Sequence, residues 1–322
     1  MPTVQQLEYV LAVHEHGHFG RAAEALGVSQ PTLSSQIQKV ESELGVSLFD
    51  RQSKPIVLTE PGKSLIELAR DVVSAHEKLM AAAGGTLSEP SGPFTLGIIP
   101  TLAPYVLPWF LQDFATRYPE VELSILERPT DSILEELAGG RMDAGILATP
   151  LGEPSLEERV LFYDPFYLYA HKDDPILGED AVEVANIDSA KLWLLEDGHC
   201  FRAQVINLCG LDERSLLDSV RFAGGSFETL RHLIDASAGY TLIPETYART
   251  LGRAARQHLI RPFDERVPTR EVSLVHHRKN WKVGVLDALR EAVQRNMPRA
   301  FQTEPSEGEI LPIRVPAKRG KR

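Results

Sequence analysis

The sequence lacks the features that build membrane spans, secretion signals and disulfide frameworks. The 322-residue chain contains no run of about eighteen apolar residues, so we expect no membrane span. Its first residues lack the basic start and long apolar core of a secretory signal, which predicts a cytoplasmic protein. There are only two cysteines, and because cytosolic thiols are normally reduced, we expect no permanent structural disulfide.

Positive charge is also scarce. Lys and Arg number 34 against 45 Asp and Glu, and the formal net charge of -11 argues against indiscriminate binding of nucleic acid. A small DNA-reading module joined to an acidic domain remains compatible with this balance, and the length predicts about two or three domains. The strongest basic run, KRGKR at residues 318–322, follows Pro-rich sequence, so we expect residues 301–322 to form a disordered tail.

Closely spaced helices are indicated at the start of the chain. We expect helices near residues 4–14 and 19–25, the second of which is rich in alanine and ends in a glycine turn. The next helix has strong start signals, because Ser29 or Gln30 can cap it and Pro31 fits its first position.

This third helix has an apolar stripe on one face and hydrogen-bonding side chains on the other. Amides and hydroxyls read base edges in the DNA major groove, and a hairpin at residues 48–59 would bring basic side chains to phosphates. A helix-turn-helix with a wing is therefore predicted for residues 1–60, the alternative being a surface helix pair without a ligand. We expect DNA contacts from Gln30, Pro31, Thr32, Ser34, Ser35, Gln36, Lys39, Arg51, Ser53 and Lys54.

A long helix is predicted for residues 60–83, where apolar residues recur at helical spacing. No neighbouring element covers this stripe, so pairing with a second copy of the chain is its natural use. Residues 84–93 (GGTLSEPSGP) form the clearest linker in the chain. The predicted parts are thus a DNA-binding domain (1–60), a linker helix and hinge (61–90) and a larger domain (91–300).

Strands alternate with helices throughout the larger domain. We expect strands at residues 94–99, 121–126, 144–148, 161–170, 192–195, 240–243 and 271–276, and helices at 103–118, 132–139, 227–238 and 283–297. This alternation predicts mainly parallel sheets with helices on both faces. Ligands of such folds bind beyond the C-terminal ends of the strands.

Both cysteines lie in the segment EDGHCFRAQVINLCG. On one continuous helix, Cys200 and Cys209 would be about 13.5 Å apart along the axis, whereas a disulfide needs alpha carbons within about 7 Å. The two thiols then cannot join unless the segment unravels, which is the logic of a switch. The alternatives are two buried thiols, or a zinc site with His199, for which no fourth ligand is evident.

Five stretches of sequence resemble a known family. The run FGRAAEALGVSQPTLSSQIQKVESELGVSLFDR resembles the winged helix-turn-helix of LysR-type transcriptional regulators. The segments IIPTLAPYVLP, PTDSILEELAGGRMDAGILA, LLEDGHCFRAQVINLCG and FETLRHLIDASAGYTLIP resemble the hydrogen-peroxide sensors within that family. The resemblance implies a two-lobed α/β regulatory domain like that of periplasmic binding proteins, with a second lobe at about residues 166–266.

The same resemblance implies roles for individual residues. Cys200 would be the peroxide-reactive thiol and Cys209 its disulfide partner. Thr101, Thr130 and His199 would hold peroxide near Cys200, with Arg278 as a supporting residue. A structural alternative stays open for both threonines, which could cap the helices expected just after them.

We therefore expect a peroxide-sensing transcriptional regulator and not an enzyme. Its expected partners are promoter DNA, hydrogen peroxide, RNA polymerase and further copies of itself, paired through the linker helix and assembled as a tetramer. No cofactor or metal is expected, because the His14, His16 and His18 cluster fits exposed or turn positions. The alternatives are a regulator that senses a small organic ligand between the lobes, and a thiol peroxidase.

Overall fold

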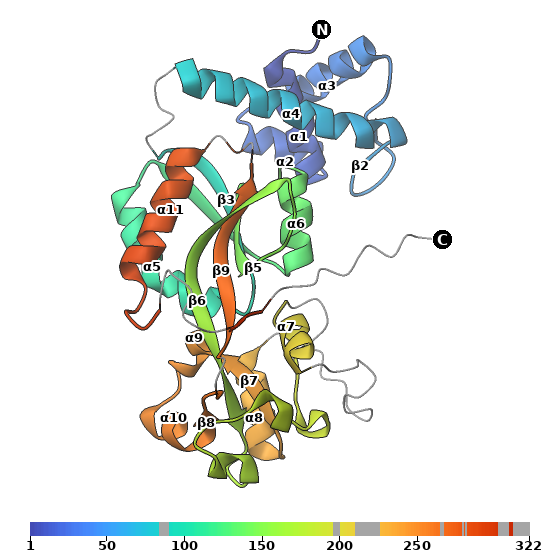
Figure 1. The fold of residues 1–322 in the computed structure, drawn as a ribbon. Helices are drawn as coiled ribbons and strands as arrows, with labels where there is room; N and C mark the ends of the chain where they lie inside the picture. Colours follow the sequence, from blue (N-terminus) through green and yellow to red (C-terminus); the bar gives the residue numbers. More distant parts are fainter. Residues whose placement is uncertain are drawn as a thin grey trace. The chain divides into compact units, whose positions relative to one another are not determined.

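The computed structural model describes residues 1–83, 90–195, 200–209, 226–264, 267–278, 280, 282–301 and 309–311. The chain divides into two compact units, Met1–Ser88 and Glu89–Arg322 (Figure 1). None of the helices in the described ranges is both long and apolar enough to cross a membrane.

The first unit is the predicted helix-turn-helix with a wing. Ser29 caps the third helix by accepting a hydrogen bond from the Thr32 N–H at 3.3 Å, as the start signals predict. The apolar stripe of that helix is fully buried at Leu33, Ile37 and Val40. The elements are α1 (Val4–His16), α2 (Phe19–Ala25), α3 (Gln30–Leu44), the antiparallel strands β1 (Phe49–Asp50) and β2 (Val57–Leu58), and α4 (Glu60–Ala83).

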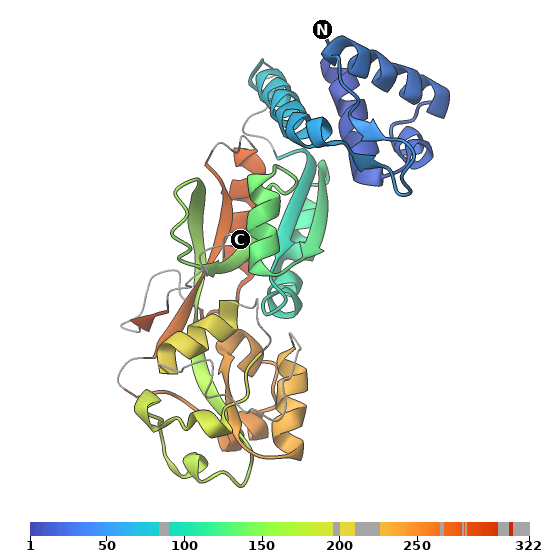
Figure 2. The same cartoon turned by 90° about the vertical axis from the view of Figure 1, so that its right-hand side faces the viewer.

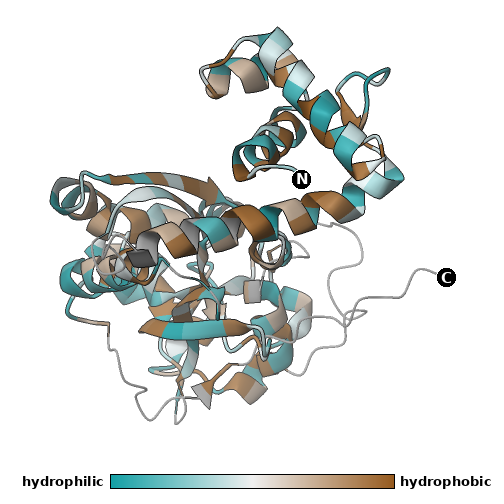
Figure 3. Ribbon diagram, turned by 90° about the horizontal axis from the view of Figure 1, so that it is seen from above, coloured by the Kyte–Doolittle hydropathy of each residue, from teal (hydrophilic) through white to brown (hydrophobic). Residues whose placement is uncertain are grey.

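The long helix α4 has one apolar face buried and another exposed. Ile66 is 3% exposed and belongs to the core that α1, α2 and α3 share. Leu68, Val72 and Leu79 are 58%, 48% and 66% exposed, and their spacing of four and seven residues places them on one stripe. Figure 3 shows brown hydrophobic segments recurring along this helix.

The second unit is built on a single path of strands in the order β4-β3-β5-β9-β6-β7, with β8 beside β6 and β10 beside β9. Its first lobe contains parallel strands, with α5 and α11 packed together on one side and α6 on the other (Figures 1 and 2). This lobe comprises β3 (Gly92–Ile98), α5 (Ala103–Arg117), β4 (Val121–Glu127), α6 (Thr130–Ala138), β5 (Ala144–Thr149), the start of β6 (Leu156–Ala170), most of β9 (Pro268–His277) and α11 (Val283–Asn296).

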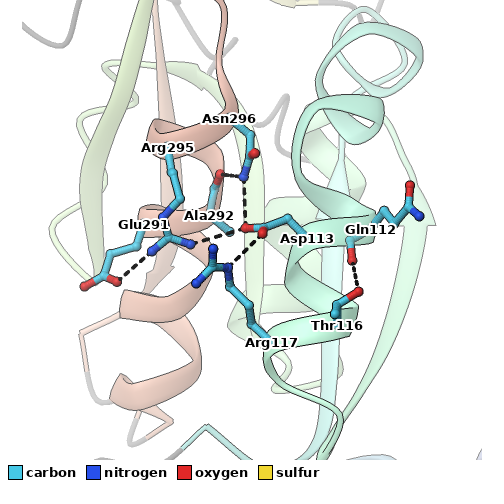
Figure 4. Close-up of polar contacts among 8 residues, drawn as sticks. All are labelled: Gln112, Asp113, Thr116, Arg117, Glu291, Ala292, Arg295 and Asn296. Atoms are coloured by element: carbon cyan, nitrogen blue, oxygen red, sulfur yellow. Dashed lines mark hydrogen bonds and ion pairs between the residues drawn. The ribbon is translucent and has the colours of Figure 1, made fainter.

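A polar clamp joins α5 to α11 (Figure 4). The Asp113 carboxylate accepts hydrogen bonds from Arg117 at 2.7 Å, Asn296 at 3.0 Å and Arg295 at 3.2 Å. The hydrogen bond from Arg117, followed by that from Asn296, lowers the pKa of Asp113. The two helices are thereby fixed together on the first lobe.

Two long strands connect the lobes. The first part of β6 pairs antiparallel with β9, and its last residues pair antiparallel with β7 (Tyr240–Pro244) and β8 (Ile260–Arg261). The expectation of mainly parallel sheets is therefore wrong, because a strand that leaves one lobe for the other and its returning partner run in opposite directions. The second lobe also has α7 (Cys200–Cys209), α8 (Phe227–Ala236), α9 (Glu245–Ala248), α10 (Arg253–Leu259) and short 3-10 turns at Pro175–Gly178, Val184–Asn186 and Ser189–Lys191.

Two further expectations are corrected here. In place of the strand expected at residues 192–195, the structure has a single bridge between Leu192 and Tyr240. The Trp193 carbonyl accepts a hydrogen bond from the Thr241 hydroxyl at 2.7 Å, so it is not free to extend a backbone ladder. The disordered tail expected at 301–322 is wrong for residues 309–311, where β10 (Glu309–Ile310) pairs in parallel with the start of β9.

Gly239 makes a test of the second lobe. Its φ is +88°, and an added Cβ would collide with the Lys191 carbonyl oxygen, so Gly239→Ala should lower the free energy of unfolding by about 2 kcal/mol or more. Gly252→Ala is the matched control, because that glycine has open space around it and a φ of -62°. Urea unfolding measures both variants, and equal midpoints would contradict this account.

Candidate functional site

The two cysteines are the end residues of one helix, α7 (Cys200–Cys209). Nine helical steps separate them by about 13.5 Å along the axis, beyond the roughly 7 Å between alpha carbons that a disulfide tolerates. Cys209 is a free thiol in this structure. The predicted geometry of an open dithiol is thus present. His199 and the Cys200 side chain lie outside the described part of the molecule.

Apolar side chains anchor α7 to the second lobe. Phe201 is 1% exposed and Val205 is fully buried. The Phe201 ring lies 4.9 Å from both the Phe166 and the Phe227 ring, centroid to centroid. The residue directly after Cys200 is therefore fixed between a lobe-connecting strand and α8.

Cys209 is partly buried at the other end of the helix. Burial raises the pKa of its thiol to about 11. This thiol is protonated at neutral pH, and because thiolates are the nucleophilic form, it reacts slowly on its own.

A buried ion pair joins the two connecting strands near one end of their ladder. Arg270 on β9 and Asp164 on β6 are both fully buried, and the Arg270 Nη2 lies 2.8 Å from the Asp164 Oδ2. Thr246 at the start of α9 adds two bonds to the carboxylate, from its N–H at 3.0 Å and its hydroxyl at 2.8 Å. The charge pair is thus surrounded by hydrogen bonds, as burial requires.

Arg270 also reaches Thr101, one of the predicted peroxide residues. It donates from Nη1 to the Thr101 hydroxyl and from Nη2 to the Thr101 carbonyl, both at 3.3 Å. Its guanidinium lies 5.9 Å from the centre of the Phe201 ring, next in sequence to Cys200. Arg270 therefore joins Thr101 of the first lobe to the cysteine helix of the second.

Thr101 and Thr130 follow neighbouring parallel strands, β3 and β4, at the same edge of the sheet. They are 1% and 4% exposed. Neither is the N-cap residue, which is Leu102 for α5 and Pro129 for α6, so the capping alternative does not hold. Within the described residues the buried Thr130 hydroxyl has no hydrogen-bond partner, which leaves it available to a small polar molecule.

A cavity of about 480 Å³ lies beside these threonines. It is bounded by Pro100 and Pro129, which directly precede Thr101 and Thr130, and by residues of the second lobe. The full lining is Pro100, Pro104, Tyr105, Glu127, Pro129, Ser226 and Phe227. The cavity therefore lies between the lobes and reaches the residue before each threonine, while the threonines themselves are buried behind its lining.

Arg278 does not join this cluster. It lies just past the far end of β9, eight residues from Arg270 and therefore about 26 Å along the strand. There its Nε donates to the Pro154 carbonyl at 2.8 Å. The sequence analysis missed Arg270. Its signal in the sequence was a lone cation at the start of an apolar strand, because a charge buried there needs an oppositely charged partner.

The predicted DNA-binding residues differ in their exposure and in the hydrogen bonds they already make. Gln30, Thr32, Ser35 and Lys39 are exposed on α3, and Pro31 is exposed at its start. Ser34 is partly buried on the same helix. The Gln36 amide oxygen accepts a hydrogen bond from the Gln6 amide at 2.8 Å, so this end of Gln36 is already engaged.

Two of the three predicted wing residues already have partners within the wing or on α3. Arg51 pairs with Glu41 at 2.8 Å, donates to the Ser34 hydroxyl at 3.5 Å and lies over the Phe19 ring at 5.2 Å. The Ser53 hydroxyl donates to Asp50 at 2.7 Å. Lys54 is exposed and has no ion pair within the described residues. Arg51 and Ser53 thus shape the wing, and Lys54 is the wing residue that is open to a phosphate.

One histidine of the alternating cluster near the end of α1 has a structural role. His18 caps α2, accepting the Gly20 N–H through Nδ1 at 3.0 Å. In the part of the chain that the structure describes, no group of three or more metal-binding side chains occurs.

Comparison with known proteins assigns the chain to a family. Residues 4–63 match the bacterial regulatory helix-turn-helix proteins of the LysR family, and residues 87–298 match the LysR substrate binding domain. The chain belongs to the LysR family. Members of this family are transcriptional regulators, as the resemblance of the sequence implied.

Named LysR-family relatives and structures are similar over most of the chain. The hydrogen peroxide-inducible genes activator of Dickeya chrysanthemi is 35% identical over 303 residues, covering 91% of this chain and 95% of that protein. The transcriptional dual regulator OxyR of Escherichia coli K12 is 35% identical over 301 residues, covering 92% and 97%.

Among solved structures, a cysteine-to-aspartate variant of full-length OxyR from Pseudomonas aeruginosa matches with a TM-score of 0.78 and 28% identity, covering 92% of this chain and 99% of that chain. A cysteine-to-serine variant of Corynebacterium glutamicum OxyR with hydrogen peroxide bound matches with a TM-score of 0.60 and 30% identity, covering 92% of each chain. The resemblance to OxyR-like peroxide sensors predicted from the sequence is therefore confirmed.

Removing Arg270 should be costly, because it leaves the Asp164 carboxylate buried without its cation. We expect Arg270→Met to lower the free energy of unfolding by about 3–5 kcal/mol, and the addition of Asp164→Asn to restore part of the loss. Arg117→Met, which breaks an exposed pair with Asp113, should cost far less. Urea unfolding measures all three, and an Arg270→Met midpoint equal to that of Arg117→Met would contradict the buried pair's importance.

The raised pKa of Cys209 predicts its reactivity with alkylating agents. In a Cys200→Ser variant, about one Cys209 thiol in a thousand should be thiolate at pH 8, given a pKa of about 11. The iodoacetamide rate, followed by mass spectrometry, should therefore still rise tenfold per pH unit at pH 8 to 10. A rate that levels off near pH 8.5 would show that the thiol is not held in a buried site.

Proposed function

We propose that this chain is a DNA-binding transcriptional regulator that senses hydrogen peroxide by reversible formation of a Cys200–Cys209 disulfide. The observation that carries the proposal is the placement of the two cysteines at opposite ends of α7, with Cys209 unbonded. The named peroxide-inducible activators and OxyR structures among the relatives support it.

Cys200 is the thiol that reacts first. It begins α7, where the helix dipole favours the thiolate, while burial keeps Cys209 protonated. The Cys200 thiolate attacks one oxygen of peroxide, the O–O bond breaks, and hydroxide leaves a sulfenic acid behind. The Cys209 sulfur then attacks the Cys200 sulfur, forming the disulfide, and the sulfenic oxygen leaves as water with the Cys209 proton.

Thr101, Thr130 and Arg270 hold the peroxide for this reaction, with His199 beside Cys200. The Thr130 hydroxyl is buried and unpartnered among the described residues, and Arg270 fixes the Thr101 hydroxyl. Hydroxyls of this kind both donate to and accept from peroxide oxygens. A preorganised pair of hydroxyls keeps the O–O bond aligned with the attacking sulfur.

Closing the disulfide requires the cysteine helix to unravel, so oxidation becomes a change in structure. The alpha carbons are separated by about 13.5 Å along the axis and must come within about 7 Å of each other, so Phe201 and Val205 cannot both keep their buried positions. Closing a ten-residue loop contributes roughly 2–3 kcal/mol in the chain-entropy account, enough to shift a two-state population by more than tenfold.

The output is a change in DNA contact by an oligomer. The exposed face of α3 enters the major groove, and Lys54 of the wing contacts a phosphate. Two chains pair along the exposed stripe of α4 formed by Leu68, Val72 and Leu79, and two pairs assemble as a tetramer. The regulator acts in the cytoplasm on RNA polymerase and is not an enzyme.

Cys200→Ser should abolish the response to peroxide and spare DNA binding, because the thiol is remote in sequence from α3. Fluorescence anisotropy on the promoter of the chain's own gene measures binding with and without peroxide, and mass spectrometry detects the 200–209 disulfide in the wild type. Cys209→Ser is the companion variant and should accumulate the sulfenic acid. A wild-type protein without the disulfide, or a Cys200→Ser variant that still responds, would favour a regulator that senses an organic ligand instead.

A further inference from the structure

A short C-terminal segment lies against the second lobe. Ile310 pairs with Thr269 in a parallel ladder, and the Leu311 N–H donates to the Thr269 carbonyl at 3.0 Å. The Leu311 side chain is 3% exposed and belongs to the second-lobe core. Residues 309–311 lie beyond residues 87–298, which the family's regulatory domain matches, so this contact is an addition to the shared fold.

The segment contacts the cysteine helix through Gln204. This residue lies midway along α7 and is fully buried, an unusual position for glutamine. Its Nε2 donates to the Leu311 carbonyl at 2.9 Å. Burying an amide is costly unless it is hydrogen-bonded, so Gln204 depends on the segment and the segment depends on α7.

We propose that residues 309–311 form a strap that holds α7 in its helical form and thereby sets how readily the Cys200–Cys209 disulfide forms. The proposal rests on the proposed redox function. The strap is tied at Thr269, the residue before Arg270, so it joins the helix to the strand that carries the buried ion pair.

The direction of the effect follows from the geometry. Gln204 lies between the two cysteines, so unravelling α7 moves its amide away from the Leu311 carbonyl. In exchange with glutathione, the two thiols become one disulfide while one glutathione disulfide becomes two glutathione thiols, which take up the two protons. The strap stabilises only the helical dithiol, so it opposes this oxidation, and its removal favours the disulfide.

The first test compares two truncations of the full chain in glutathione redox buffers. A chain ending at residue 308 lacks the strap, and a chain ending at residue 312 keeps it while losing the remaining residues. We expect the shorter chain to be oxidised with an equilibrium constant about tenfold larger, which is a shift of about 30 mV. Equal constants would overturn the strap, whereas absence of a 200–209 disulfide in every chain would instead overturn the redox function.

The second test does not depend on the disulfide. In a Cys200→Ser background, the strap predicts that truncation at residue 308 speeds amide hydrogen exchange in α7 at least tenfold, and that Gln204→Met does the same in part. Asn207→Ala, an exposed position on the same helix, is the control and should leave the exchange rate unchanged. Unchanged exchange in both the truncation and Gln204→Met would contradict the strap even where peroxide sensing holds.

Discussion

The buried ion pair between Arg270 and Asp164 is the interaction on which the regulatory unit depends. β6 and β9 are the strands that connect the lobes, and each contributes one charge to the pair. Two buried charges are costly to desolvate, and the bonds from Thr246 and to Thr101 offset that cost only in this geometry. Because Asp164 and Arg270 are directly opposite partners in the β6–β9 ladder, the pair fixes the register of the two strands where they pass from one lobe to the other.

The same pair links the proposed chemistry to the strands that connect the lobes. Arg270 contacts Thr101 beyond the end of β3, while its guanidinium faces the Phe201 ring of α7. In the proposed switch, unravelling α7 moves Phe201 away from an arginine that both lobes share. In this proposal the disulfide acts on the paired strands β6 and β9 through the contact of Phe201 with Arg270.

Local signals made much of this fold predictable, and non-local pairing limited the rest. Caps and spacing predicted α3 from Ser29 onward. The separation of the two cysteines was calculated for one continuous helix, and α7 is such a helix. The antiparallel return of β9, the contact of Leu311 with Gln204 and the loss of the strand at 192–195 depend on segments far apart in sequence. The role expected for Arg278 came from the resemblance. The local sequence does not reveal which end of β9 faces Thr101, because that too depends on a contact between distant segments.

In the proposed switch, the limited stability of α7 allows a two-electron reaction to change the structure. A ten-residue helix is marginal on its own, since isolated helices shorter than about 12–15 residues are unstable in water. α7 persists because Phe201 and Val205 are buried and Gln204 is bonded to Leu311. Those few contacts set the free energy that disulfide closure must exceed. The proposed threshold for peroxide therefore depends on the packing around the helix as much as on the thiols themselves.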